Sequence, residues 1–169
     1  MNSDTDSLSI SYDNGIGVVS AVRPIQGEGV APALLNISDP LTFDYGDQST
    51  GSVTRKTFTV THSGSVDANL VFSSPLTLPF KYNGSGYPGT GGNCGASILI
   101  GDTCTIVVNF EPTATGVATD TINLNYDNGV SPQVSSRPLT GNGVTPANLS
   151  ISDTAVSYTH LTLPTILLV

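Results

Sequence analysis

Residues 119–153 read TDTINLNYDNGVSPQVSSRPLTGNGVTPANLSISD, and residues 5–39 align with them without a gap. The offset is 114 residues throughout, so that Tyr12 falls on Tyr126 and Arg23 falls on Arg137. Of the 35 aligned positions 17 are identical, and several others exchange Leu for Ile or Ile for Val. A match of this length indicates an internal repeat of about 114 residues, and a unit of that size can fold as its own domain.

The repeat divides the chain into one complete unit and parts of its neighbours. We expect residues 33–147 to form a complete domain, residues 1–32 to be the C-terminal strands of a preceding repeat, and residues 148–155 to begin a following one. The chain is then a fragment of a tandem array, and the partners of each unit are the neighbouring repeats. The first residues lack the basic and apolar segments of a signal peptide, so we expect that peptide outside this fragment.

The last 14 residues, VSYTHLTLPTILLV, break the repeat. By comparison with the first unit, a continuation similar to residues 40–46, PLTFDYG, is expected here. The string VSYTHLTLPT instead resembles one reading frame of a sequencing-library adapter. We therefore expect residues 156–169 to be adapter read-through, with a divergent native strand as the alternative.

Short apolar stretches recur between turn signals in the complete unit. Phe58 and Val60 alternate with threonines, and Ile106, Val108 and Phe110 alternate with more polar neighbours, as is typical of half-buried strands. Asp-Asn-Gly at 13–15 and 127–129 predicts hairpin turns, because Asn-Gly tolerates positive φ. The predicted strands are 34–38, 41–45, 55–62, 68–73, 97–100, 104–110, 120–126 and 134–140. This pattern, without helical periodicity, predicts an all-β fold, an immunoglobulin-like antiparallel β-sandwich.

The composition restricts the partners. The net charge is −8, the pI is near 4.2, and only five Lys and Arg residues are present, which argues against nucleic-acid binding. No stretch of about 18 apolar residues occurs, so no membrane span is expected in this fragment. The chain has only two Glu and two Lys against 18 Gly, which disfavours a helical protein.

Two cysteines, Cys94 and Cys104, lie in NCGASILIGDTC. No C-x-x-C pair or neighbouring His accompanies them, so a metal site is not expected. A catalytic Cys would need a His base, and the only His before the last 14 residues is His62. A disulfide is therefore favoured over free thiols, and it implies an oxidising compartment and hence an exported, extracellular or cell-surface protein.

We expect no enzyme activity and no cofactor. His62, in THSG, is expected at the surface or in a turn, and Glu111 precedes Pro112 at a strand end without a second acid suited to glycosidase chemistry. The glycine-rich loop GSGYPGTGG (84–92) lacks the strand–helix context of a phosphate-binding loop and is expected to be flexible. Tyr82 and Tyr87 are the candidate ligand contacts, for a glycan or a protein.

The order of motifs in the unit resembles the choice-of-anchor D repeat. LTFDYG (41–46) and TFTVTHSG (57–64) are similar to its F-x-F-G … x-V-T-N-x-G opening, with His62 where the pattern has Asn. Pro79-Phe80, Cys94-Gly95 and LIGDTCTIVVNFEP (99–112) are similar to its C-G … L-x-x-G-x-x-C-x-x-x-V-x-F-x-P centre, and LTGNGV (139–144) to its end. The resemblance implies an immunoglobulin-like sandwich of large exported bacterial proteins, related to the ASH and Hydin-type domains of ciliary proteins. It implies no enzyme activity and transfers no binding residue.

Three functions remain open from the sequence. The first is a structural spacer or adhesive module in a large bacterial surface or secreted protein. The second is a carbohydrate- or protein-binding module that uses the loop 82–92. The third is an intracellular scaffold of the ASH or Hydin kind, which reduced thiols at Cys94 and Cys104 would favour.

Overall fold

The structure is a computed structural model that describes residues 2–39, 41–84 and 86–152. Within these ranges the secondary structure is entirely β. The expected start of a following repeat is described only as far as residue 152, where it forms no strand, and the predicted read-through at 156–169 lies outside the described residues. The strands are β1 (Asn2–Asp13), β2 (Val18–Gly29), β3 (Leu35–Ile37), β4 (Phe43–Ser49), β5 (Thr54–His62), β6 (Ala68–Ser73), β7 (Phe80–Tyr82), β8 (Ser97–Ile98), β9 (Thr103–Phe110), β10 (Gly116–Asp127) and β11 (Pro132–Val144).

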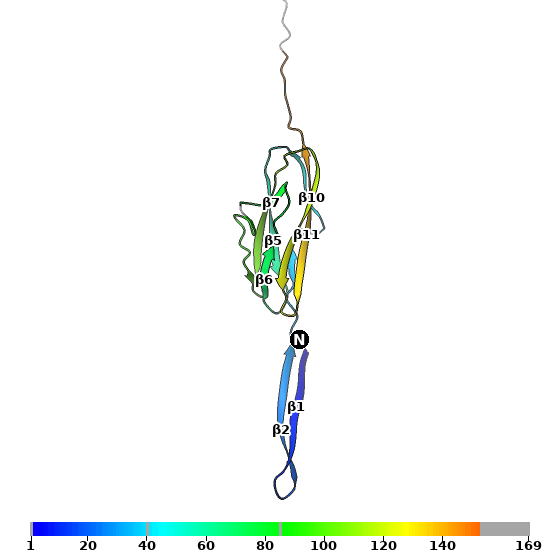
Figure 1. The fold of residues 1–169 in the computed structure, drawn as a ribbon, viewed down its shortest axis with the longest axis vertical. Helices are drawn as coiled ribbons and strands as arrows, with labels where there is room; N and C mark the ends of the chain where they lie inside the picture. Colours follow the sequence, from blue (N-terminus) through cyan, green and yellow to red (C-terminus); the bar gives the residue numbers. More distant parts are fainter. Residues whose placement is uncertain (1, 40, 85, 153–169) are drawn as a thin grey trace, which may run out of the picture.

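Strands β3 to β11 form two sheets that pack face to face (Figure 1). One sheet has the order β3-β5-β9-β7 and the other has the order β4-β11-β10-β6-β8. After β3 pairs antiparallel with β5, the chain crosses to the second sheet, where β4 pairs parallel with β11. When β3, β5, β6, β7, β9, β10 and β11 are lettered A to G in chain order, the two sheets contain the A-B-E-D and C-F-G orders of an immunoglobulin domain, and β4 and β8 are additional edge strands. The predicted all-β, immunoglobulin-like sandwich is thereby confirmed.

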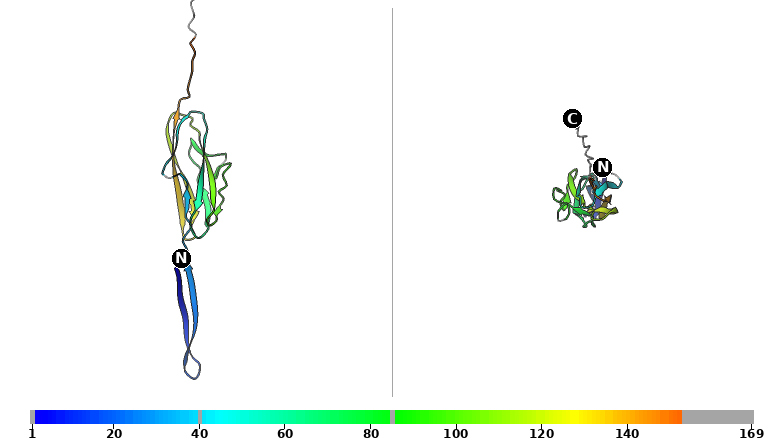
Figure 2. Two further views of the ribbon diagram at one scale, coloured as in Figure 1. Left: turned by 180° about the vertical axis from the view of Figure 1, so that it is seen from behind. Right: turned by 90° about the horizontal axis from the view of Figure 1, so that it is seen from above.

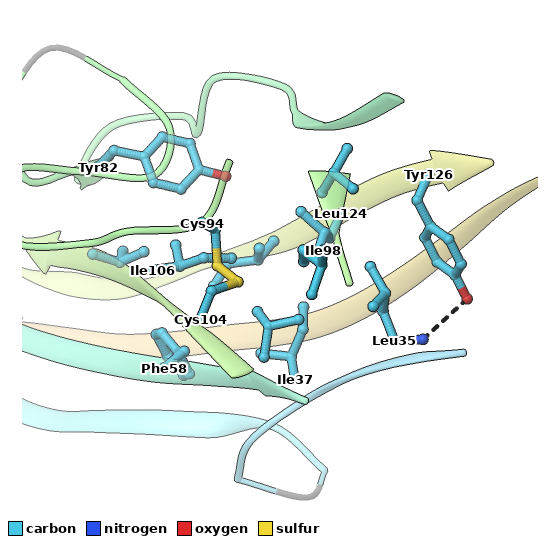
Figure 3. Close-up of a cluster of buried hydrophobic side chains, with 14 of the residues drawn as sticks. Leu35, Ile37, Phe58, Tyr82, Cys94, Ile98, Cys104, Ile106, Leu124 and Tyr126 are labelled. Carbon is cyan, nitrogen blue, oxygen red and sulfur yellow. Dashed lines mark hydrogen bonds between the residues drawn. A yellow bond between two sulfur atoms is a disulfide. The ribbon is translucent and has the colours of Figure 1, made fainter. Parts of the chain in front are cut away.

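The core lies between these two sheets. Aromatic rings from both sheets meet there, with the Phe80 and Phe110 rings stacked at 4.9 Å and Tyr45 tilted against both. The Tyr45 hydroxyl donates to the carbonyl oxygen of Val108, and burial raises the pKa of Tyr45. Figure 3 shows the neighbouring part of the core, where the Tyr126 hydroxyl accepts a hydrogen bond from the backbone N–H of Leu35 at 3.3 Å.

Strands β1 and β2 form a separate two-stranded hairpin outside the sandwich (Figures 1 and 2). Its register runs from Asn2 opposite Gly29 to Asp13 opposite Val18, and that of β10 and β11 runs from Gly116 opposite Gly143 to Asp127 opposite Pro132. Every pair in the second hairpin is therefore the first hairpin's pair shifted by 114 residues. The repeated sequence folds into the same local structure twice.

The turns of the two hairpins also match, and their Asp and Asn side chains explain why. Asp13 and Asp127 each accept a hydrogen bond from the glycine two residues later, at 2.8 and 2.7 Å. Both glycines have φ near +88°, a conformation that favours glycine. The Asn side chain of each turn accepts two further backbone N–H groups, so the turn is stabilised by residues within itself.

Candidate functional site

The predicted ligand loop, residues 82–92, packs along the edge of β9, beyond the residues that pair with β7. The backbone N–H of Asn83 donates to the carbonyl oxygen of Val107 at 2.9 Å, and the N–H of Val107 donates to that of Pro88 at 2.8 Å. Val107 and Asn109 are buried as a result, although strict alternation would leave them solvated. The expectation of one solvated face on this strand is therefore wrong, because the loop covers it.

Two glycines make this close packing possible. A Cβ atom at Gly89, where φ is +88°, would lie 2.3 Å from the carbonyl oxygen of Val107. A Cβ atom at Gly92 would lie 2.6 Å from the carbonyl oxygen of Pro88 and 2.8 Å from that of Thr105. Only glycine permits such an approach of backbone to backbone. The expectation of a flexible loop is corrected for residues 86–92, whose glycines serve packing against β9.

The two candidate tyrosines differ in their surroundings. Tyr82 is only 3% exposed, its hydroxyl donates to Ser73, and its ring belongs to the core (Figure 3). Tyr87 is partly buried and packs edge-on against Tyr82, with 6.0 Å between the ring centroids. Burial raises the pKa of both hydroxyls, that of Tyr87 to about 12, so both are protonated at neutral pH. Tyr82 is thus a residue of the hydrophobic core, and Tyr87, which is partly exposed, is better placed than Tyr82 to contact a ligand.

A pocket of about 260 Å³ opens beside these rings. The Tyr87 hydroxyl oxygen is buried and has no hydrogen-bond partner among the described residues. An unpaired buried hydroxyl is costly, so a hydrogen-bonding group that reached it would be stabilised there. The pocket is lined by Ser73, Pro75, Leu76, Lys81, Tyr82, Gly84, Gly86 and Tyr87.

Cys94 and Cys104 form a disulfide, with 4.9 Å between their Cα atoms. Cys94 ends the packed loop and Cys104 lies in β9, and both are buried in the core (Figure 3). The bond closes a segment with a sequence separation of 10 residues, for which the chain-entropy model gives about 2–3 kcal/mol of stabilisation. The neighbouring Asn93 side chain accepts hydrogen bonds from the backbone and hydroxyl of Thr105, which fixes the same junction.

A polar network surrounds the buried Asn109 on the outer face of this sheet. The Asn109 amide donates to Asn83 and Glu111, and its oxygen accepts from Arg55 at 3.3 Å. Lys81 pairs with Glu111 at 2.7 Å, and this hydrogen bond lowers the pKa of Glu111 below its ordinary value. The network provides hydrogen-bond partners for the polar groups that the packed loop buries. Glu111 therefore has a structural role, as the acceptor for Asn109 and Lys81.

His62 is 2% exposed, which corrects the expectation of a surface or turn residue. It ends β5 opposite Leu35, and its backbone N–H donates to the carbonyl oxygen of Asp102 at 3.0 Å. Its two ring nitrogens have no hydrogen-bond partner in the described part of the chain. The covering residues come from distant parts of the sequence, which is why the local T-H-S-G pattern did not reveal the burial.

Within residues 2–39, 41–84 and 86–152, no group of three or more His, Cys, Asp or Glu residues is arranged to hold a metal ion. The same ranges hold no helix that is long and apolar enough to cross a membrane.

These features define an immunoglobulin-like β-sandwich with one buried disulfide. No protein-family model matches the sequence, and no curated protein is similar to it, so the resemblance to the choice-of-anchor D repeat stays a prediction. The solved structures that are similar to this chain have low sequence identity to it. One is the VesB protease of Vibrio cholerae, with 11% identity and a TM-score of 0.46; the match covers 66% of this chain and 32% of that one. A second is a protein of unknown function from Porphyromonas gingivalis W83, with 11% identity and a TM-score of 0.49; the match covers 83% of this chain and 66% of that one. A third is the ASH/PapD-like domain 7 of human CEP192, with 12% identity and a TM-score of 0.44; the match covers 75% of this chain and 95% of that one. The chain spans about a third of the length of the Vibrio protease.

Proposed function

We propose that residues 33–147 are one non-enzymatic repeat of a larger exported protein, in which such repeats act as structural spacers or adhesive modules. The observation that carries the proposal is the second hairpin, which matches the first in sequence and, pair for pair, in register. A hairpin that closes a sandwich at 116–144 and recurs alone at 2–29 is what a tandem array leaves when it is cut within a repeat.

The connection between the hairpin and the sandwich supports a spacer role. The carbonyl oxygen of Ala31 accepts a hydrogen bond from Ser65 at 3.1 Å, and the backbone N–H of Ala33 donates to the carbonyl oxygen of Asn128 at 3.0 Å. A Cβ atom at Gly64 would lie 2.3 Å from the carbonyl oxygen of Pro32, so this glycine allows the connection to lie against the domain. A short, hydrogen-bonded connection restricts the angle between successive units and so favours an extended array.

The disulfide supports export, because such bonds persist in oxidising compartments and are rare in the cytosol. The test is mass spectrometry of Cys94 and Cys104 after rapid alkylation of the protein in its native host. We expect both to be resistant to alkylation before reduction. Reduced thiols would contradict export and favour an intracellular scaffold. The full-length gene tests the array itself, which requires further copies of the 33–147 unit on either side.

A ligand-binding role is the second candidate, and the unpartnered Tyr87 hydroxyl in its pocket is the observation that favours it. A glycan array with the whole chain tests this role against a Tyr87→Phe variant, which removes only the hydroxyl. Binding that the variant loses supports a ligand site at this loop. The absence of binding to any glycan would remove the carbohydrate-binding role, whereas a protein ligand would still have to be tested separately.

A further inference from the structure

The hairpin formed by β1 and β2 presents an uncovered apolar face. Its inward-facing residues occupy the positions that β10 and β11 bury in the sandwich, but here about half of each side chain is exposed. The equivalent residues and their exposed fractions are Leu8 53% and Ile122 0%, Ile10 58% and Leu124 0%, Tyr12 52% and Tyr126 5%, and Ile25 52% and Leu139 1%. A contiguous exposed apolar face of this kind marks a surface that binds another protein segment.

The hairpin also carries the side chains with which β10 and β11 bind the rest of the sandwich. Arg137 donates to the carbonyl oxygens of Ile37 and Leu41 in the crossing from β3 to β4, and its equivalent is Arg23. Asp120 accepts the backbone N–H of Thr77 at 2.6 Å, and Tyr126 accepts that of Leu35. The equivalents of these two residues are Asp6 and Tyr12.

Two glycines complete the match. A Cβ atom at Gly141 would lie 2.7 Å from the Phe110 ring, and one at Gly143 would lie 2.2 Å from the carbonyl oxygen of Ala114. The equivalent positions are Gly27 and Gly29, where a Cβ atom would meet nothing within 4 Å in this structure. The free hairpin thus retains two glycines that its present surroundings do not require but that insertion into a sandwich does require.

We propose that this face is complementary to the sandwich of a second copy of the chain and binds it once that copy's own β10–β11 hairpin is displaced, so that β1 and β2 take the place of β10 and β11. Intramolecular replacement is excluded by length. An inserted Gly29 would lie at the end of the sandwich where Gly143 lies, whereas Ala33 is fixed at the opposite end beside Asn128. A strand of this length spans roughly 40 Å, and the three residues between Gly29 and Ala33 reach no more than about 14 Å.

At two positions the β1–β2 hairpin fits the sandwich less well than the β10–β11 hairpin does, which weakens its binding there. Glu28 would replace Asn142, whose amide donates to the Asp47 carboxylate at 2.8 Å, and two carboxylates would then face each other. Asp4 would replace Ala118, which packs partly buried against the core. The resident hairpin therefore binds better than the incoming one, and the wild-type chain stays monomeric. Exchange becomes visible when the resident hairpin is disabled, as in other domain-swapped proteins.

The experiment uses the full chain and makes the same substitution at equivalent glycines of the two hairpins, first in each hairpin separately. Gly141→Asp puts a carboxylate against Phe110 and displaces the resident hairpin, so the hairpin of another copy fills the site. We expect folded, head-to-tail oligomers whose weight-average mass in sedimentation equilibrium is at least double the 17.4 kDa of the monomer and rises with concentration. The matched variant Gly27→Asp stays monomeric with unchanged stability, because nothing surrounds that position.

The double variant Gly27→Asp/Gly141→Asp decides between exchange and simple aggregation of an unfolded chain. We expect it to lose both the ordered oligomers and the protease resistance of Gly141→Asp, since neither hairpin can then insert. Equal behaviour of the single Gly141→Asp variant and the double variant would overturn the proposal, as would a folded monomeric Gly141→Asp variant.

A chain truncated after residue 115 lacks the resident hairpin altogether and gives a second test of the same site. We expect it to form the same oligomers, and we expect Gly27→Asp to abolish them. The proposal rests on the proposed function, because a tandem repeat gives every hairpin of the array the same complementary sandwich. Its failure is distinguishable, since a chain that does not exchange hairpins can still be an exported spacer with an intact disulfide.

Discussion

The hairpins β1–β2 and β10–β11 have closely related sequences and the same register, but one lies alone and the other closes a sandwich. Their Asp-Asn-Gly turns make the same side-chain hydrogen bonds in both settings. The turn and register are therefore determined locally, while burial is supplied by the rest of the domain. The comparison separates what a hairpin sequence encodes from what its surroundings add.

The largest expected difference is in hydrogen exchange. A two-stranded hairpin alone is marginally stable in water, so the backbone amides of β1 and β2 should exchange by local opening. Those of β10 and β11 should exchange only with global unfolding, at least about a thousandfold more slowly for a domain stability of about 5 kcal/mol. Amide-resolved exchange measured by NMR checks this. Similar protection in both hairpins would mean that β1–β2 is covered in solution.

The next largest effect comes from matched core truncations. Leu124→Ala removes a fully buried side chain and should lower the free energy of unfolding by about 3 kcal/mol. Ile10→Ala, at the equivalent position, should change it by less than about 0.5 kcal/mol, because its side chain is 58% exposed. Urea unfolding followed by circular dichroism measures both. A comparable loss for Ile10→Ala would contradict the independence of the two hairpins.

The disulfide should stabilise the sandwich and leave the structure of the free β1–β2 hairpin unchanged. Replacement of Cys94 and Cys104 by Ala should lower the free energy of unfolding by about 2–3 kcal/mol. The turn of the free hairpin at Gly15 should keep its chemical shifts, since its hydrogen bonds come from Asp13 and Asn14 only. Urea unfolding and amide NMR spectra of the variant check the two parts. Changed shifts in this hairpin would reveal coupling that the separate sheets do not predict.

The equivalent arginines Arg137 and Arg23 should differ less in their effects on the free energy of unfolding. Arg137 donates to two backbone carbonyls, so Arg137→Gln should lower the free energy of unfolding by about 1–3 kcal/mol. Arg23→Gln, in the free hairpin, should have almost no effect on the monomer. The same Arg23→Gln substitution should weaken oligomers of the Gly141→Asp variant if hairpins exchange as proposed. Urea unfolding of the single variants and sedimentation of Gly141→Asp/Arg23→Gln measure these effects.

The features that sequence alone predicted are those determined by local pattern. The strand at 68–73 was predicted with the bounds of β6, and alternation located β5 and β9 to within one residue. The Asp-Asn-Gly turns and the internal repeat located the hairpin of β10 and β11. These features depend on residues within a few positions of one another or on direct similarity between two segments.

The features that sequence missed depend on contacts between distant segments. Strand β7 has three residues, too few for a periodic pattern, and pairing with β9 defines it. The burial of Tyr82 and His62 arises from elements that cover them from elsewhere in the chain. The glycines at 89 and 92 suggested a flexible loop, because composition does not distinguish glycine used for freedom from glycine used for close packing.

The smallest predicted effect concerns acid stability, to which the sandwich contributes two ion pairs. Lys56 pairs with Asp39 at 3.0 Å and Lys81 pairs with Glu111 at 2.7 Å, and in each case the hydrogen bond from lysine lowers the carboxyl pKa below its ordinary value of 3.8 or 4.5. A carboxyl group whose pKa is lower in the folded state stabilises that state above its unfolded pKa. The contribution disappears as the pH falls through the folded pKa.

The stability of the sandwich should therefore begin to fall as the pH drops below about 4.5 and should continue to fall at lower pH. Lys81→Met removes the partner of Glu111, so the variant should lose less stability than the wild type over the same interval. Because both carboxyl groups are partly exposed to solvent, the difference should be small and should shrink further in high salt. Urea unfolding between pH 3 and pH 6 measures it, and an equally steep loss in Lys81→Met would show that other carboxyl groups control acid stability.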